Sequence, residues 1–337
     1  MPQVRIGISG WTYAPWRGVF YPKDVAQKRE LEYASRQLNS IEINGSFYSL
    51  QRPASYAMWY DATPDDFVFS MKGGRFITHM KRLKEIEVPL ANFLASGPLK
   101  LKEKLGPILW QFPPNFQFDA DRFASFFELL PRETEAMAKL ARKHDPKMKG
   151  RVWTQADAKR PVRHAVEIRH ESFKSERFID LCRDQQIAIV VADTAGKWPV
   201  IEEFTADFMY ARLHGEEELY VSGYTEEALA MWQQKVERWR DTGRDTFVYF
   251  DNDVKVRAPF DAMRLAARLA GLGAPPPPES LLKKVKEKPR EHWLPLRDAG
   301  KPSKIRRRDS SPVPSRRPRG TASGRVQKRR PARKRRQ

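Results

Sequence analysis

The sequence predicts an α/β fold: a (β/α)8 barrel of parallel strands in a single domain, followed by a disordered basic tail. Eight strand patterns occur along the chain, and most are followed by a helical segment, an alternation typical of parallel sheets. Polar side chains gather at the ends of these strands, where barrels of this kind carry their sites. No Gly-x-Gly-x-x-Gly motif follows the first strand, which disfavours the alternative of a doubly wound open sheet.

The expected strands are short runs in which apolar and polar residues alternate. In the fifth, Val166 and Ile168 alternate with Glu167 and Arg169, so two opposite charges share one face. Such charges are costly to bury unless they are paired, and they are tolerated where strands end in a cleft. The expected strands cover residues 5–9, 40–44, 67–72, 107–112, 163–170, 187–193, 208–214 and 246–250.

Apolar residues at helical spacing predict helices between the strands. Pro53 stands in the first turn of one helix, and Thr225, followed by two glutamates, favours the start of another. Phe47 and Tyr48 are expected in one loop and His79 in the next. The expected helical segments cover residues 29–38, 53–60, 89–105, 119–130, 133–143, 174–185, 225–240 and 259–270.

Composition places limits on the class of protein. The chain has 337 residues, 40% of them hydrophobic, which is enough for one large domain. A single cysteine, Cys182, excludes an internal disulfide and a cysteine-based metal cage, and it suits a reducing cytoplasm. The first residues lack the apolar run of a signal peptide, and no run of about 18 apolar residues predicts a membrane span. We therefore expect a cytoplasmic protein.

Charge divides the chain near residue 274. Residues 1–274 hold 40 Lys and Arg against 37 Asp and Glu, whereas residues 275–337 hold 22 against 5. We therefore expect a barrel domain over 1–274, with an insertion at about 132–160, and a disordered Pro-, Arg- and Lys-rich tail over 275–337. Such a tail favours contact with DNA or RNA phosphates, although a merely solvated extension would have the same composition.

The polar residues at the strand ends define a candidate site at the barrel mouth. The carboxylates of Glu42, Glu167 and Asp193 and the imidazole of His214 are candidates for proton transfer. The same four side chains are candidate ligands for a divalent metal, although no paired-histidine motif identifies one and the cofactor stays unknown. A buried Glu–Arg network with a purely structural role is the alternative for these charges.

Other polar and aromatic residues are candidates for binding a ligand. Lys72, Arg169 and Arg212 carry charges suited to an anion. Large aromatic side chains after the first two strands offer a stacking wall for a base or a sugar, or else they cover the core. The full set expected to contact a ligand is Trp11, Tyr13, Asn44, Tyr48, Lys72, Gln111, Arg169, His170, Arg212 and Asn252.

These motifs together resemble a known family. Gly7-Ile8-Ser9-Gly10-Trp11, Ile41-Glu42-Ile43-Asn44, Val166-Glu167-Ile168-Arg169-His170 and Arg212-Leu213-His214-Gly215 occur in the order found in the YecE-like family, domain of unknown function 72. The resemblance covers about residues 4–271 and implies a TIM-barrel-like fold without implying a reaction. The family's last motif usually reads Phe-Asn-Asn-Asp, whereas this chain has Asp251 at the second position.

Two functions follow as hypotheses. In the first, the barrel mouth binds a small anionic, sugar-like or nucleotide-like ligand, and the carboxylates and His214 support hydrolase or isomerase chemistry. In the second, the protein binds nucleic acid without catalysis, and the basic tail supplies the phosphate contacts. The sequence leaves the substrate and the oligomeric state open.

Overall fold

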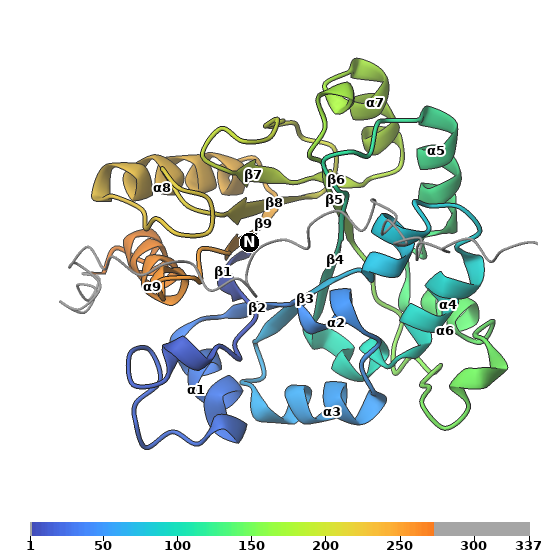
Figure 1. Ribbon diagram of the computed structural model, residues 1–337, viewed down its shortest axis with the longest axis horizontal. Helices are drawn as coiled ribbons and strands as arrows, with labels where there is room; N and C mark the ends of the chain where they lie inside the picture. Colours follow the sequence, from blue (N-terminus) through green and yellow to red (C-terminus); the bar gives the residue numbers. More distant parts are fainter. Residues whose placement is uncertain (1, 273–337) are drawn as a thin grey trace, which may run out of the picture. The chain divides into compact units, whose positions relative to one another are not determined.

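The computed structural model describes residues 2–272, and these form a barrel of parallel strands ringed by helices (Figure 1). Every strand pairing is parallel, in the order β6-β5-β4-β3-β2-β1-β9-β8-β7. The predicted fold class is therefore confirmed. The strands are β1 (Val4–Ser9), β2 (Ser40–Ile43), β3 (Val68–Lys72), β4 (Leu105–Gln111), β5 (His164–Glu167), β6 (Ala188–Ile189), β7 (Val191–Asp193), β8 (Phe208–Leu213) and β9 (Asp245–Phe250).

The sixth predicted strand, 187–193, is two strands in the structure, and it closes the barrel. Its first half, β6, pairs with β5, and its second half, β7, pairs with β8. Val190 lies between the halves and donates its backbone N–H to the carbonyl of Val166 at 2.9 Å. One continuous stretch of chain therefore pairs with both β5 and β8. Counted together, β6 and β7 make one strand of the barrel, so the nine strand segments correspond to the eight strands that the sequence predicts.

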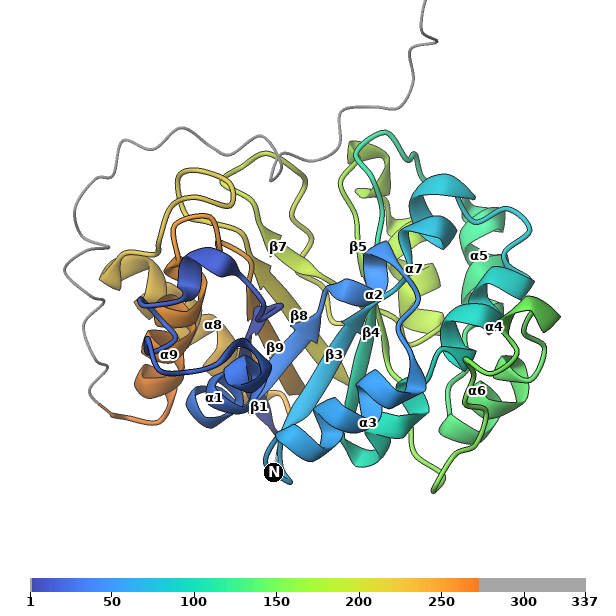
Figure 2. The ribbon, with the colours of Figure 1, turned by 60° about the horizontal axis from the view of Figure 1, so that its bottom comes forward.

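Helices cover the outside of the barrel, with α1, α8 and α9 on one side and α4 to α7 on the other (Figure 2). Two predicted loops are wrong: Phe47 and Tyr48 belong to the short helix α2, and His79 lies in a single π-helical turn. The helices are α1 (Glu30–Gln37), α2 (Gly45–Tyr48), α3 (Pro53–Ala62), α4 (Glu87–Ala95), α5 (Ala120–Leu129), α6 (Thr134–Ala141), α7 (Glu176–Asp184), α8 (Glu226–Asp241) and α9 (Arg257–Leu269), with the π turn at Phe76–Met80 and 3-10 turns elsewhere.

Strand alternation separates two buried regions. Ile6, Ile8, Ile41 and Ile43 belong to the large apolar layer between the strands and the helices. Ala165 belongs to a smaller apolar cluster, which fills the lower part of the barrel interior. Polar residues occupy the inner face toward the carboxyl ends of the strands, and this distribution fixes where chemistry can occur.

The segment at about 132–160 makes a closed excursion from the barrel. Its ends meet where the Val162 N–H donates to the Arg132 carbonyl at 2.8 Å and the Thr134 N–H donates to the Arg160 carbonyl at 2.9 Å. Helix α6 packs against α4, and the N–H of Trp153 donates to the carbonyl of Ala95 at 2.8 Å. The predicted boundary at 274 and the tail over 275–337 lie outside the described residues.

Candidate functional site

Six inward-facing side chains at the carboxyl ends of the strands form a charged layer across the barrel mouth. All six are less than 9% exposed: Ser9, Glu42, Lys72, Gln111, Glu167 and Arg212. Each of these residues ends its strand or lies one residue from its end. The sequence placed all but Ser9 in the candidate set, and the structure brings these five together.

Arg212 is the centre of this layer. Its side chain is fully buried and donates to three carboxylates: Glu42 at 2.9 Å, Glu167 at 2.7 Å and Asp251 at 2.8 Å. A further contact runs to the Ser9 hydroxyl at 3.1 Å. Each nitrogen of the guanidinium therefore has a partner within the protein, so Arg212 holds the carboxylates in place rather than offering a free cation to an anion.

Glu167 is the second hub of the layer. Its Oε2 accepts hydrogen bonds from Gln111 at 2.8 Å and from Arg212, and its Oε1 accepts from Arg169 at 2.8 Å. Burial raises the pKa of Glu167, but the charges of Arg169 and Arg212 outweigh it, and the pKa lies well below its usual range. Arg169 is stacked 3.8 Å from the ring centroid of Trp198, which fixes its position at the rim.

Asp251, Asp253 and His214 form a group with opposed protonation tendencies. Oδ2 of Asp251 lies 3.0 Å from Nδ1 of His214. Burial acts to raise the pKa of Asp251, but Arg212 and His214 bring it well below its usual range. Burial and the neighbouring Asp251 raise the pKa of Asp253, while burial and Arg212 lower that of His214. An ionised carboxylate, a carboxyl with a raised pKa and a neutral imidazole therefore belong to one group.

Lys72 differs from Arg212, the other cation of the layer. Among the described residues, its side-chain nitrogen contacts the ring of Phe47, whose centroid lies 4.4 Å from Nζ. Burial and the charge of Arg212 lower the pKa of Lys72 to about 8. His79 packs edge-on against Phe47 at 5.1 Å, and burial together with Lys72 lowers its pKa to about 4. Nδ1 of His79 lies 2.8 Å from the Thr78 hydroxyl.

The predicted aromatic wall divides into covered and open parts. Trp11 packs edge-on against Trp59 at 5.3 Å and belongs with the apolar layer. Tyr13 donates to the Ser9 carbonyl, and its ring lies 4.6 Å from that of Trp16. Tyr48 is 64% exposed and is the member of the set that presents an open ring surface. Asn44, at the start of α2, has a buried Oδ1 for which the described residues supply no hydrogen-bond partner.

Three predicted site residues lie apart from the cluster. Asp193 alternates with inward-facing Ala192, so its carboxylate turns outward and accepts from Tyr224 at 3.0 Å; burial raises its pKa. Asn252 alternates with Asp251 and donates instead to Asp261 of α9 at 2.9 Å. His170 follows β5, which ends at Glu167 rather than continuing to 170, and accepts from the Ser172 N–H as a helix cap. The structure therefore does not bring these three side chains together at the mouth, although the sequence predicted it. Asp193 and Asn252 lie on the opposite face of the chain from the inward-facing residues, and His170 caps a helical turn.

Besides Ser9 and Asp253, two more residues absent from the predicted set belong to the cluster. Asp251 is one, and the period-2 pattern through Phe247 and Tyr249 would have selected it over Asn252. Tyr210 is the other: it lies two residues before Arg212 and donates to Glu42 at 2.6 Å. Tyr210 also lies 2.8 Å from the Ser70 hydroxyl, so it links the charged layer to the smaller apolar cluster below it.

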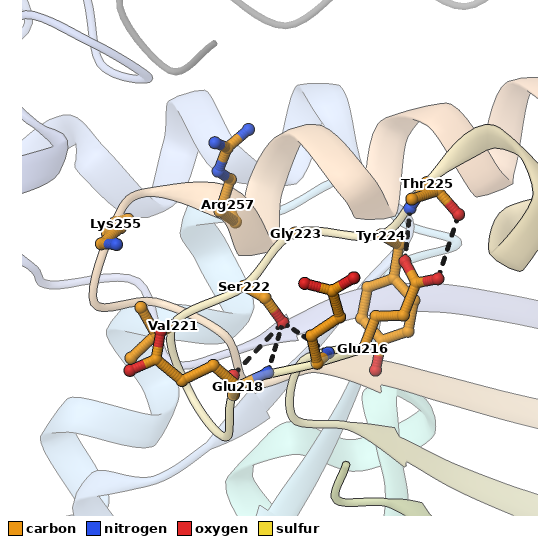
Figure 3. Close-up of a pocket in the computed structure, with 10 residues that line it drawn as sticks. Glu216, Glu218, Val221, Ser222, Gly223, Tyr224, Thr225, Lys255 and Arg257 are labelled. Atoms are coloured by element: carbon orange, nitrogen blue, oxygen red, sulfur yellow. Dashed lines mark hydrogen bonds between the residues drawn. The ribbon is translucent and has the colours of Figure 1, made fainter. Parts of the chain in front are cut away.

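A hollow of about 490 Å³ lies beside this cluster, between the loop after β8 and the start of α9 (Figure 3). Its wall combines the acidic residues Glu216 and Glu218 with the basic residues Lys255 and Arg257. Glu216 is occupied, since it accepts at 2.7 Å from the N–H of Thr225, the residue that caps α8. The residues around Arg212 do not line this hollow.

The structure also bears on metals and membranes. Within residues 2–272, no three His, Cys, Asp or Glu side chains form a group able to hold a metal ion. Over the same residues, no helix is both long enough and apolar enough to cross a bilayer.

The fold and the mouth define a parallel α/β barrel with a buried ionic network at the carboxyl ends of its strands. Residues 5–282 match the model of the family described as "Protein of unknown function DUF72". The chain belongs to the DUF72 family, as the sequence motifs predicted.

Individual relatives agree with this assignment. The chain is 28% identical to UPF0759 protein YunF of Bacillus subtilis over 129 residues, which is 36% of this chain and 44% of that protein. It is 26% identical to UPF0759 protein YecE of Escherichia coli K12 over 113 residues, or 34% and 39% of the two chains. The matched stretches thus span less than half of these relatives. A DUF72 family crystal structure from Thermotoga maritima has the same fold, with a TM-score of 0.62, 24% identity, and coverage of 80% of this chain and 99% of that one.

Proposed function

We propose that the barrel mouth binds a small anionic ligand of sugar-like or nucleotide-like structure. The observation that supports this proposal is the contrast between the three cations at the barrel mouth. Arg212 and Arg169 each form ion pairs with carboxylates, whereas Lys72 has a ring contact and no ion pair within the described residues. An 8%-exposed ammonium without a carboxylate partner is a suitable counter-charge for an entering anion.

The proposed chemistry is proton transfer, as in an isomerase or a hydrolase. Asp251 is held ionised by Arg212, and the neutral imidazole of His214 lies 3.0 Å away, so this pair supplies a base. Asp253, whose pKa is raised by burial and by Asp251, supplies an acid. A base and an acid kept apart in pKa on one strand end are the requirement for moving a proton between two positions of a ligand.

Calorimetric titration with glucose 6-phosphate, AMP and neutral glucose tests the binding proposal. We expect the full-length protein to bind at least one of the two anions and to bind glucose more weakly. Lys72→Gln should weaken binding of that anion about 10–150-fold, since a charged hydrogen bond contributes about 1.5–3 kcal/mol. The control is Lys81→Gln, which removes a surface lysine paired with Glu85 and should leave affinity unchanged. Equal affinities for all three compounds, or no effect of Lys72→Gln, would contradict the proposal.

Solvent exchange tests the chemistry separately from binding. If the mouth moves protons, a bound ligand should acquire deuterium from D2O at carbon, which NMR detects. Asp251→Asn removes the proposed base and should abolish the exchange. Exchange that continues at the wild-type rate in this variant would rule out Asp251 as a base.

A second proposal concerns the tail, because its charge is strongly one-sided: residues 275–337 carry 22 Lys and Arg against 5 Asp and Glu. We propose that this segment binds nucleic-acid phosphates without sequence preference. Fluorescence anisotropy with DNA and RNA oligonucleotides should show binding that weakens steeply as salt rises. A chain ending at residue 274 should lose this binding, and unchanged affinity after the truncation would refute the proposal.

A further inference from the structure

We propose that Lys72 is a nucleophile that forms a reversible imine with a ligand carbonyl, so that the substrates of the mouth are anionic carbonyl compounds such as open-chain sugar phosphates or 2-oxo acids. This inference rests on the proposed function, because it names the class of anionic ligand that the same site takes. It goes beyond that function by assigning a covalent step to one side chain.

Residues 2–272 contain two buried lysines, and their side-chain nitrogens differ in their contacts. Nζ of Lys104 donates to the carbonyls of Tyr60 at 2.7 Å and Thr63 at 2.8 Å, so its nitrogen is fully engaged in holding the chain. Lys72 is buried to a similar degree, yet its nitrogen faces only the ring of Phe47. A buried amine without hydrogen-bond acceptors has its lone pair available for reaction once the proton leaves.

The position of Lys72 in the barrel suits a nucleophile. It is the last residue of β3 and faces inward, where active sites of parallel barrels lie. Its backbone is fixed, because its carbonyl accepts from the Ser46 hydroxyl at 2.7 Å. A nucleophile on a rigid strand end approaches a bound carbonyl in a defined direction.

The electrostatic surroundings of Lys72 favour the same role. Burial and the nearby guanidinium of Arg212 disfavour the ammonium form, and they lower the pKa of Lys72 to about 8. Asp251, Glu167 and Glu42 oppose this effect only in part. A desolvated lysine beside a second cation is a recognised way to obtain a neutral amine near neutral pH.

The step balances without a further reagent. The neutral nitrogen attacks the carbonyl carbon, and the new C–N bond forms as the carbonyl π bond breaks, which gives a carbinolamine. The C–O bond then breaks, and the oxygen leaves with the two protons that the nitrogen carried, as one water molecule. The product is an imine, which becomes an electron-withdrawing iminium on protonation. It would make a neighbouring C–H easier for the Asp251–His214 pair to deprotonate.

Reductive trapping tests the inference. The full-length protein is incubated with pyruvate or glyceraldehyde 3-phosphate and sodium cyanoborohydride, and modified lysines are located by peptide mass spectrometry. We expect Lys72 to be modified at least tenfold faster than Lys104 and the surface Lys81. Lys72→Arg should lose the fast adduct while Lys104→Arg retains it, and thermal unfolding of both variants shows whether each is folded.

Calorimetric titration with the same two compounds, without reductant, distinguishes this inference from the proposed function. Selective modification of Lys72 supports the inference. Binding of either compound without modification of Lys72 overturns the imine and leaves the proposed anion site standing. If neither compound binds and Lys72 is not selectively modified, the inference is overturned. The titrations with glucose 6-phosphate and AMP then test the proposed function independently.

Discussion

Arg212→Gln should destabilise the protein strongly, because Arg212 holds three carboxylates, of which only Glu167 has a second arginine partner, Arg169. The wild-type guanidinium lies 2.9 Å from Glu42, 2.7 Å from Glu167 and 2.8 Å from Asp251, and both glutamates are fully buried. Removing one partner of a buried ion pair costs about 3–5 kcal/mol, since the remaining charge stays desolvated. We expect a loss of at least this size in the free energy of unfolding, measured by urea denaturation at pH 7.

The pH dependence of this loss identifies its cause. In the wild type, burial raises the pKa values of Glu167 and Asp251, but Arg212 and other cations depress them below the unfolded values. The stability that these carboxylates contribute is therefore present above about pH 4 and is lost as pH falls through their folded pKa values. Without Arg212 both pKa values rise, so the deficit of the variant should shrink as the pH is lowered toward 4.

A surface ion pair provides the control for Arg212→Gln. Arg183 pairs with Asp180 at 2.6 Å, but both side chains are about half exposed, so Arg183→Gln should cost less than about 1 kcal/mol. The reasoning is refuted if the two variants lose similar stability, or if the deficit of Arg212→Gln does not change with pH. Either result would mean that the buried network does not depend on the charge of Arg212.

Two further predictions concern packing and titration in the barrel wall. A methyl group on Gly7 would lie 2.1 Å from the carbonyl oxygen of Ser40, so Gly7→Ala should cost about 1–3 kcal/mol in urea denaturation, whereas Gly45→Ala, with no neighbour closer than 3.4 Å, should cost much less. Burial lowers the pKa of His164 to about 3, below its unfolded value of about 6.5. Between these pH values the unfolded chain binds one more proton at His164 than the folded chain, so the free energy of unfolding should fall by about 1.4 kcal/mol per pH unit as the pH drops. His164→Gln should remove this part of the slope when unfolding is measured from pH 6.5 to 4. An unchanged slope would contradict the lowered pKa of His164.

The barrel was predictable because each strand carries its own alternation. Val166 and Ile168 on one face, with Glu167 and Arg169 on the other, suffice to place a charged pair inside the barrel, and the structure pairs those two charges at 2.8 Å. The division of the sixth strand at Val190 was not predictable, since an apolar run from 187 to 192 carries no alternation. The strand with which β6 or β7 pairs depends on how all the strands are arranged in the closed barrel.

The sequence predicts that the site lies at the ends of the strands. It predicts less well which side chains face the site and which of them pair with one another. Parity alone would have replaced Asn252 by Asp251 and removed Asp193, because neighbouring residues on a strand face opposite ways. The isolation of Lys72 depends on something else. Arg212 and Arg169 form the ion pairs with the carboxylates, so Lys72 is left without one. No local pattern in the sequence indicates which of the three cations forms these pairs.

The pairing of β1 with β9 has a consequence for synthesis on the ribosome. Ile8 pairs with Phe250, so the first strand waits for roughly 240 further residues before its second neighbour exists. At roughly 5–20 residues per second this interval lasts about 12–50 s. During that time the nascent chain carries an unpaired strand edge, which is a template for wrong pairing with another chain. Translation speed and chaperone occupancy over this window, rather than the strength of any single contact, should therefore govern the yield of folded protein.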